Sequence, residues 1–239
     1  MPARRQPPSD QLPLSLAADG DERPPLPIRL SLPLAAEGHA PFDDEAYLFE
    51  PWWPGAHATI KREGERLLLR TEHLVDPLVA FPELREVLTQ LSVEGIIVEG
   101  TLLALDREGR PDPRLLRRCL SDEGARDEFA EGAFVATDMP YLEGSSIARL
   151  PFIERRRRLA AAISDSDHCV VSRGIVGEGR TLGRAVAAMG LDAISARRLD
   201  ARWKGGPAGD AWLRLPVVEP QHAEATPFLV LLKRLPLGD

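Results

Sequence analysis

Amine nucleophiles are scarce in this 239-residue sequence. Lysine occurs only at Lys61, Lys204 and Lys233, whereas 27 of the 30 basic residues are arginine. An arginine guanidinium stays protonated and offers no free amine, so it can neutralise a phosphate but cannot attack one. Covalent chemistry through an amine therefore has few positions available, and Lys61 and Lys204 are the two within the body of the chain.

Histidine and cysteine offer little metal or redox chemistry. His57 and His73 invite a metal or acid–base interpretation, but no carboxylate or thiol cluster stands at ligand spacing, so ordinary polar histidines are favoured. Cys119 and Cys169 are too few for a disulfide framework and fit no zinc or iron–sulfur spacing. We expect both cysteines to be buried small hydrophobic residues, and we expect no metal site.

Two short runs could contact a nucleic acid. Trp52 and Trp53 could stack on a base or an exposed strand end, which is worth about 1–3 kcal/mol per base, although filling a cavity as ordinary core is favoured. The arginine run 155–158 could follow a phosphate backbone. Four consecutive helical residues point all around the helix axis, so a mostly solvated helix with local ion pairs is the favoured interpretation.

Strand and helix patterns alternate through the middle of the chain, with short turns between them. This alternation predicts an α/β or α+β body with antiparallel hairpins, one of them at the Glu63-Gly64-Glu65 turn. Prolines at 82, 113 and 151 stand where they would open helices. Strands are expected at 58–62, 66–71, 96–106, 133–137, 168–172, 193–197 and 212–218, and helices at 82–91, 113–120, 151–163 and 180–189.

The two ends differ from this body in composition. Residues 1–41 contain nine prolines and are interpreted as a disordered or loosely docked arm. Apolar residues alternate at positions 28, 30, 32 and 34, which could form a short edge strand docked on the body. Residues 42–218 are then the folded domain, and 219–239 form a tail whose residues 228–232 could add a last strand.

Charge and hydropathy limit the cellular setting. The net charge of −7 argues against a protein that coats nucleic acid nonspecifically, although a local basic face remains compatible with it. The sequence contains neither an uninterrupted apolar run of 18 residues nor an N-terminal secretory signal. A cytoplasmic protein with no membrane partner is therefore expected.

Seven segments of the body resemble bacterial ATP-dependent DNA ligases of the end-joining type, in the order that the family has them. Any one segment would be weak, but seven in register on compatible elements indicate similarity to the adenylation (nucleotidyltransferase) domain of these ligases. The segments are YLFEP at 47–51, FPEL at 81–84, VEGTLLALDREGRPD at 98–112, FVATDMPYLEG at 134–144, LPFIERRRRL at 150–159, GLDAISARRLD at 190–200 and WLRLPVV at 212–218.

The resemblance implies a fold and a reaction. The fold would be α+β, with two antiparallel sheets flanked by helices in an ATP-grasp-like adenylation domain and ATP between the sheets. In the family, a lysine of the pattern E-x-K-x-D-G-x-R attacks the α-phosphate of ATP, carboxylates hold Mg²⁺, and AMP passes to a DNA 5′-phosphate. The OB-fold domain of complete ligases does not fit into the roughly twenty residues after the last motif, so none is expected.

The first motif has lost its reactive residues. Glu50 and Gly55 match the family, but the position of the nucleophile holds Trp52, whose indole nitrogen has no lone pair for attack on phosphorus. Pro54 and His57 stand where the family has its aspartate and arginine. We therefore expect no catalytic residue in this motif.

The later motifs keep some charge and lose other groups. The family's D-G-E reads Glu99-Gly100-Thr101 here, and Thr137 replaces an aromatic residue of the nucleotide pocket. Arg197 and Arg214 replace lysines of the family and could still bind a phosphate. Pro216 stands where the family has its last motif lysine and cannot do so. The residues expected to line the degenerate nucleotide pocket are Glu50, Trp52, Gly55, Glu99, Arg197 and Arg214.

These changes favour a ligase-like protein without catalysis, acting as a binding or scaffold module in DNA repair. Its partners would be DNA ends or a repair protein such as an active ligase, and it would need no cofactor. One alternative is an active, divergent ligase or nucleotidyltransferase that uses ATP, Mg²⁺ and either Lys61 or Lys204. Another is a sensor that binds ATP or AMP without reacting, with Arg197 and Arg214 on the phosphates.

Overall fold

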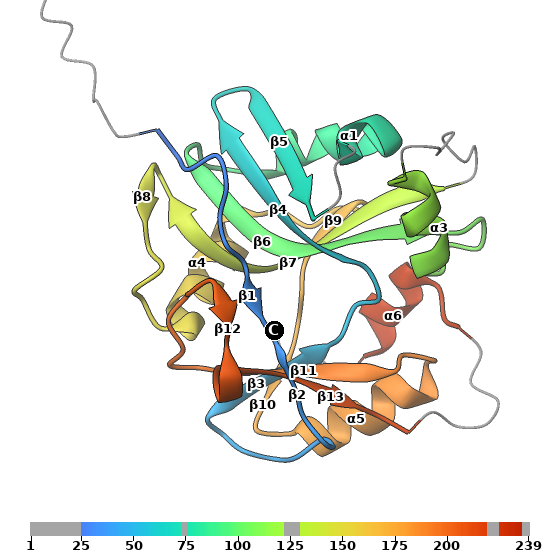
Figure 1. Ribbon diagram of the computed structural model, residues 1–239. Helices are drawn as coiled ribbons and strands as arrows, with labels where there is room; N and C mark the ends of the chain where they lie inside the picture. The colour runs from blue at the N-terminus through green and yellow to red at the C-terminus, as the bar shows by residue number, and fades with distance from the viewer. Residues whose placement is uncertain (1–24, 73–75, 122–129, 219–224, 236–239) are drawn as a thin grey trace, which may run out of the picture.

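The computed structural model describes residues 25–72, 76–121, 130–218 and 225–235. In this part of the chain two large sheets lie one above the other, with helices packed on their outer faces and at their ends (Figure 1). A third sheet of two short strands lies at one side of the gap between them. The α+β class expected from the sequence is confirmed.

The six-stranded sheet is built around two long strands, β6 and β7, at its centre. Its order is β5-β4-β6-β7-β8, with β9 parallel to β7 and the other pairs antiparallel. The β4–β5 hairpin turns at Gly64, whose φ of 57° is readily adopted by glycine. The strands are β4 (Ala56–Glu63), β5 (Arg66–Thr71), β6 (Ile96–Leu105), β7 (Glu131–Leu142), β8 (Ser145–Ser146) and β9 (Cys169–Val171).

The five-stranded sheet has the order β10-β3-β11-β13-β2, and the third sheet pairs β1 with β12. Both large sheets are mainly antiparallel as expected; β2 and β9 are added to them in parallel, and β1 and β12 of the third sheet are also parallel. The strands are β1 (Pro33–Leu34), β2 (Ala36–Glu37), β3 (Tyr47–Pro51), β10 (Ile175–Val176), β11 (Ala193–Arg198), β12 (Gly206–Pro207) and β13 (Trp212–Pro216).

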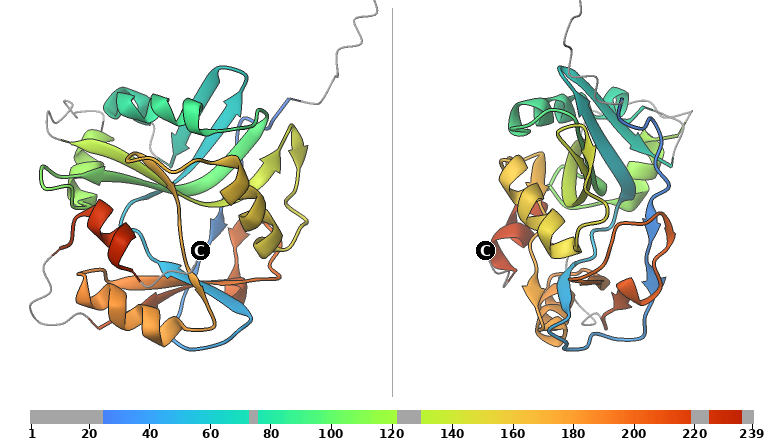
Figure 2. Two further views of the ribbon diagram at one scale, coloured as in Figure 1. Left: turned by 180° about the vertical axis from the view of Figure 1, so that it is seen from behind. Right: turned by 90° about the vertical axis from the view of Figure 1, so that its left-hand side faces the viewer.

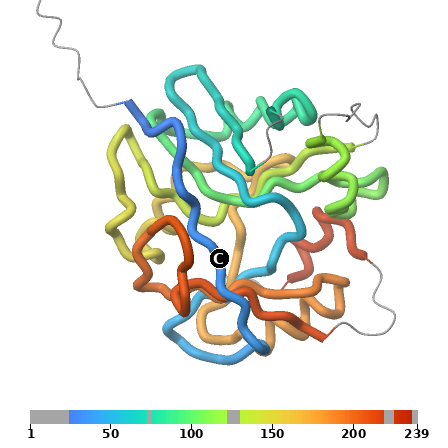
Figure 3. The backbone as a smooth tube through the Cα atoms, viewed as in Figure 1, coloured from blue at the N-terminus to red at the C-terminus, as the bar shows by residue number. Residues whose placement is uncertain are grey.

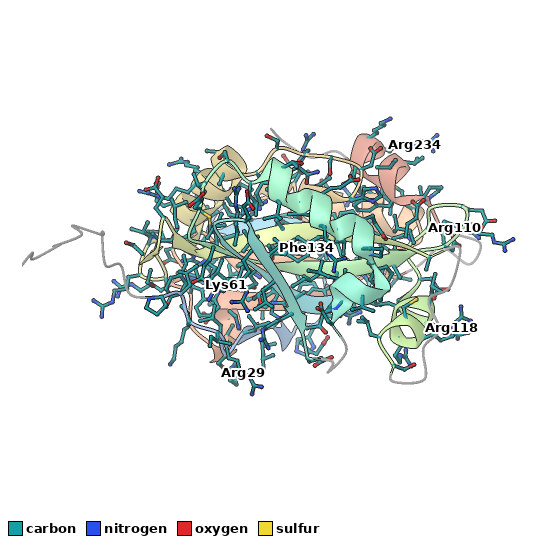
Figure 4. The ribbon with its side chains drawn as sticks, turned by 90° about the horizontal axis from the view of Figure 1, so that it is seen from above. Arg29, Lys61, Arg110, Arg118, Phe134 and Arg234 are labelled. Carbon is teal, nitrogen blue, oxygen red and sulfur yellow. The ribbon has the colours of Figure 1, made fainter. Side chains whose placement is uncertain are left out.

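Alternation along β6 and β7 divides the core into two layers. Successive residues of a strand face opposite sides, so Leu102 and Phe134 enter the layer beneath the outer helices while Leu103 and Val135 enter the layer between the sheets. Both strands are buried on both faces, which explains their nearly continuous apolar sequences. Phe134 lies at the centre of the body in Figure 4, whereas Arg29, Arg110, Arg118 and Arg234 extend from its periphery.

The expected helices are present, although the stretch that begins at Pro82 is a 3-10 turn followed by one turn of α-helix. Asp112 caps α3 by accepting from the backbone amides of Arg114 and Leu115. Among the described residues no helix is long and apolar enough to cross a membrane. The helices are α1 (Pro77–Ala80), η1 (Pro82–Glu86), α2 (Val87–Gln90), α3 (Pro113–Cys119), α4 (Phe152–Ala162), α5 (Gly179–Ala188), η2 (Gly209–Ala211) and α6 (Phe228–Arg234).

The segment expected to form a last strand at 228–232 is instead helix α6. An apolar run of this length fits either element, and here Phe228 and Leu231 are both buried, at the i and i+3 spacing of a helix. Phe228 packs edge-on against Trp53, with ring centroids 5.4 Å apart. Seen from behind, α6 and α5 lie toward the same end of the body (Figure 2). Tertiary packing therefore favours a helix for a segment whose local sequence fits either a strand or a helix.

The described part of the N-terminal arm lies along the body and contacts both large sheets. We call residues 25–38 the strap. Leu26 is buried, and its backbone pairs with Glu63 and Lys61 of β4 at one end of the strap. At the other end β2 adds to the edge of the five-stranded sheet. The tube drawing shows the strap passing from one sheet to the other across the gap (Figure 3).

A buried ion cluster holds α4 against β7 of the six-stranded sheet. Arg155 is 1% exposed and binds both oxygens of Asp138 on β7, through Nε at 2.8 Å and Nη2 at 2.7 Å. Arg197 on β11 reaches the same carboxylate at 3.2 Å. The expected solvated arginine helix is therefore wrong for Arg155 and Arg156, which are buried, and describes only Arg157 and Arg158.

Removing Arg155 should destabilise the fold much more than removing Arg158 from the same helix. Arg155→Ala leaves the Asp138 carboxylate buried without its two strongest donors, so we expect a loss of about 3–5 kcal/mol in the free energy of unfolding. Arg158→Ala removes an exposed cation and should change it by about 0.5 kcal/mol or less. Urea denaturation of both variants measures this, and equal losses would contradict the role given to the cluster.

Candidate functional site

A cavity of about 270 Å³ lies between the two large sheets. One wall comes from the connection between β3 and β4, with Trp52 and Gly55, and another from β11 and β13, with Arg197 and Trp212. The strap adds residues 33–35 and Glu37. The polypeptide's own N-terminal segment therefore forms part of the cavity rim.

The two adjacent tryptophans have different environments. Trp52 is half-buried on the cavity wall, and its ring lies 5.9 Å from that of Trp212 at a 37° tilt. Trp53 is 4% exposed, packs on Phe228 and lies with its indole nitrogen 3.5 Å from the Ser172 hydroxyl. Trp53 therefore fills the core as favoured from the sequence, whereas Trp52 keeps a face available to the cavity.

Trp212 is held in place by polar contacts. Its indole nitrogen donates to the Ser195 hydroxyl at 2.8 Å, and the His57 ring meets it edge-on at 5.6 Å. The Arg197 guanidinium lies 4.0 Å from the centre of the Trp212 ring, a cation–π geometry. Trp212 is therefore a fixed aromatic surface beside Trp52, backed by a buried cation.

Glu99 lies just behind the cavity and is fully buried. It accepts from Arg197 at 3.3 Å, pairs with His57 at 3.2 Å and accepts the indole N–H of Trp203. Burial raises the pKa of Glu99, but the Arg197 charge and the contacts to His57 and Trp203 outweigh it and lower the pKa to about 2. Glu99 is therefore a buried anion with three donors on its carboxylate.

Arg197 links the two buried carboxylates. Its terminal nitrogens bind Glu99 and Asp138, on β6 and β7 of the sheet opposite its own strand β11. The side chain is 5% exposed, and its Nε has no hydrogen-bond partner among the described residues. A buried donor without an acceptor is unfavourable by about 1–3 kcal/mol, so this atom weakens the stabilisation that the buried ion cluster provides.

Glu50 and Gly55 have structural explanations. Glu50 is 2% exposed and accepts from Arg156 at 2.9 Å, and Arg156 also donates to the Ser172 carbonyl oxygen. A Cβ on Gly55 would overlap the carbonyl oxygen of Leu102, so the close approach of the β3–β4 connection to β6 requires glycine there. Neither residue's presence depends on a nucleotide.

The structure brings together most of the residues predicted for the degenerate pocket. Glu50, Trp52, Gly55 and Arg197 line the cavity, and Glu99 contacts it through Arg197 and His57. Arg214 lies outside the cavity lining and is paired with Asp192 at 2.7 Å and Glu37 at 3.4 Å, with its guanidinium 5.6 Å from the Trp52 ring. Sequence reasoning missed Trp203 and Asp138 as partners of the buried charges, because only tertiary structure brings them there.

The two candidate replacement lysines lie elsewhere. Lys61 donates to the Leu26 carbonyl oxygen at 2.8 Å, pairs with Glu63 at 3.0 Å and does not line the cavity. Lys204 lines a separate cavity on the far side of Arg197 and Trp212. His73 lies outside the described residues. Cys119 and Cys169 are buried as predicted, and burial raises the pKa of the Cys169 thiol to about 12.

The donor set around the cavity does not fit ATP with a divalent metal. Both buried carboxylates, Glu50 and Glu99, are engaged by arginines, and no three metal-binding side chains come together in the described parts of the chain. Among the described residues Arg197 is the one buried cation that lines the cavity, and two carboxylates balance it. Triphosphate charge would therefore have little compensation here.

Comparison with known proteins identifies sequences and structures similar to this chain. No family model matches the chain. It is 30% identical over 177 residues to a DNA ligase of Thermococcus fumicolans, 30% over 152 residues to the multifunctional non-homologous end joining protein LigD of Pseudomonas aeruginosa, and 29% over 195 residues to DNA ligase C1 of Mycolicibacterium smegmatis. These matches cover 70%, 63% and 76% of this chain, but only 32%, 17% and 56% of the relatives.

Solved structures agree on the fold. A mycobacterial DNA ligase D complexed with ATP and MES superimposes with a TM-score of 0.63 at 22% identity, covering 78% of this chain and 60% of that one. A Lig E DNA ligase gives a TM-score of 0.55 at 16% identity, covering 79% and 69%. The homologues of this chain are thus ATP-dependent DNA ligases, including ligase domains of the end-joining type, and the chain has their nucleotidyltransferase adenylation-domain fold.

Proposed function

We propose that this protein is a non-catalytic ligase homologue that acts as a binding module in DNA end joining. One observation carries the proposal: the position that matches the family's nucleophile is occupied by Trp52, on the wall of the cavity between the sheets. An indole cannot form the covalent link to AMP that the family's reaction requires. The fold is kept while the reactive groups are absent from their positions, which supports binding without turnover.

The partner in this proposal is a DNA end or a repair protein such as an active ligase. The similarity to end-joining proteins supports this setting. With a net charge of −7, the chain is unsuited to nonspecific coating of DNA, so its contacts with DNA would be local or made through a protein partner. Such a role requires neither Mg²⁺ nor ATP hydrolysis.

Incubation with ATP and Mg²⁺ should leave the protein unmodified. We expect no AMP adduct by radiolabel transfer or by intact-protein mass spectrometry, because no lysine lines the cavity among the described residues. A homologous active ligase treated in parallel provides the positive control. A stable protein–AMP adduct would refute the proposal.

If an adduct did form, two variants would locate it. Lys61→Ala and Lys204→Ala remove the lysines that could substitute for the missing nucleophile, and Lys233→Ala is the matched control in α6. Loss of the adduct in one of the first two variants would establish the alternative of a divergent nucleotidyltransferase.

A second candidate function is binding of a purine base or nucleoside without reaction. The observation that favours it is the open cavity with Trp52 and Trp212 on its walls. Its volume of about 270 Å³ is slightly below the ~300–1,000 Å³ of pockets for drug-sized ligands, so it suits a nucleoside better than a nucleoside triphosphate. Arg197, the buried cation among the described lining residues, is already paired with Glu99 and Asp138, which also favours an uncharged ligand.

This candidate predicts that adenosine binds at least as tightly as ATP. An enzyme that depends on the triphosphate would bind ATP more tightly than adenosine. Trp52→Ala should weaken adenosine binding about ten-fold, since stacking on one aromatic ring contributes about 1–3 kcal/mol. Trp52→Phe keeps a ring and should retain most of the affinity. Calorimetric titration measures the affinity of the unaltered protein for adenosine and ATP and of both variants for adenosine. Absence of adenosine binding at millimolar concentration would exclude this candidate function but would not affect the proposal of a non-catalytic role.

A further inference from the structure

The strap is fixed to the six-stranded sheet by charged side chains of β4 that bind the backbone of Leu26. The Glu63 carboxylate accepts the Leu26 N–H at 3.1 Å, and the Lys61 ammonium donates to the Leu26 carbonyl oxygen at 2.8 Å. Lys61 and Glu63 also pair with each other at 3.0 Å, and Leu26 is 4% exposed. We call Leu26, Lys61 and Glu63 the clamp. Hydrogen bonds to charged groups are stronger than neutral ones, so the clamp is a firm attachment.

Between the clamp and β2 the strap is held more weakly. Its middle belongs to no helix or strand, and the apolar side chains of Ile28 and Leu34 are 67% and 56% exposed. β1 pairs with β12 over only two residues, and the amides of Gly206 and Ala208 donate to the carbonyl oxygens of Leu32 and Leu34 at 2.9 Å. A segment with few buried apolar contacts and short strand pairing opens at low free energy.

The other end of the strap is attached to the five-stranded sheet. β2 pairs with β13 at Ala36 and Glu37, and the Gly38 amide donates to the Arg214 carbonyl oxygen at 2.8 Å. The Glu37 carboxylate also pairs with the Arg214 guanidinium at 3.4 Å. The strap is therefore bound at both ends, to different sheets, and weakly held between them.

The weakly held part of the strap lies at the cavity between the sheets. Pro33, Leu34 and Ala35 line this cavity together with Trp52 and Trp212. The strap crosses from one large sheet to the other (Figure 1), and in the side view of Figure 2 it lies on the opposite side of the gap from α4 and α6. Movement of the strap would therefore expose the cavity on a side that no helix covers among those two.

We propose that the strap is a lid over the cavity between the sheets, hinged at residues 36–38 and held shut by the clamp. Release of Leu26 lets the short β1–β12 pairing break, and residues 33–35 then leave the cavity wall. The clamp sets how often the cavity is open, whatever the cavity binds, so the lid does not depend on the proposed function. It also gives Lys61 a role that requires no reaction with ATP.

Hydrogen exchange of single amides in the full chain, followed by nuclear magnetic resonance, tests the lid. Glu63→Ala removes the clamp carboxylate and should speed exchange about ten-fold or more at Gly206 and Ala208, whose acceptors are strap carbonyl oxygens. The Gly38 amide, at the hinge, should keep its rate. Glu65→Ala is the matched control, since it removes an exposed carboxylate from the same hairpin, and it should change these rates by about two-fold or less.

Quenching of tryptophan fluorescence by acrylamide, an uncharged probe, reports access to the cavity wall. Glu63→Ala should increase the quenching, because the lid is open more often. The increase should disappear when Trp52→Phe and Trp212→Phe are added, since these substitutions remove the two half-buried tryptophans that line the cavity.

Three results would overturn the lid. One is unchanged exchange at Gly206 and Ala208 in Glu63→Ala, and another is equal acceleration by Glu65→Ala. The third is equal acceleration at Gly38 or at Phe134, which is fully buried and whose amide donates to the His168 carbonyl oxygen within the body. In that case the clamp would stabilise the whole fold, and the strap would not move as a separate element.

Discussion

The structure depends on pairing three buried arginines with three buried carboxylates across the gap between its sheets. Arg155 and Arg197 share Asp138, Arg197 also binds Glu99, and a further arginine on α4 binds Glu50 on β3. Burying an ion without a partner is unfavourable by several kcal/mol, so each pair is tolerated only in one arrangement of β3, β7, β11 and α4. The distance between the cavity walls is thus set by the protein's own charges and not by a bound nucleotide.

This constraint explains how the fold persists without its family's chemistry. The charges balance, three cations against three anions, so a tryptophan at position 52 leaves none of these buried carboxylates without a cation. The carboxylates that could hold a metal are occupied by arginine, which cannot be deprotonated at ordinary pH. Paired in this way, the groups stabilise the relative position of the sheets, and the cavity retains shape and aromatic surface but little free charge.

Local pattern was enough to predict most strands and helices, because alternation and proline position act over a few residues, whereas the residues around the cavity were predicted from the resemblance to ligase motifs. Local pattern was insufficient where contacts between residues distant in the sequence determine the type of element or the burial of a side chain. Residues 228–232 form a helix because Phe228 packs on Trp53, and the arginines at 155 and 156 are buried because carboxylates from two sheets converge on them. The strap was recognisable as apolar alternation, but its parallel pairing with β12 and β13 depends on strands about 170 residues away in the sequence.

Arg197 joins the two large sheets at the wall between two neighbouring cavities. Its guanidinium lies against Trp212, which lines both spaces, and its terminal nitrogens are fixed by Glu99 and Asp138. Because two buried carboxylates already neutralise this cation, little of its charge remains for a phosphate. The residue that the resemblance would place on a phosphate therefore holds β11 against β6 and β7.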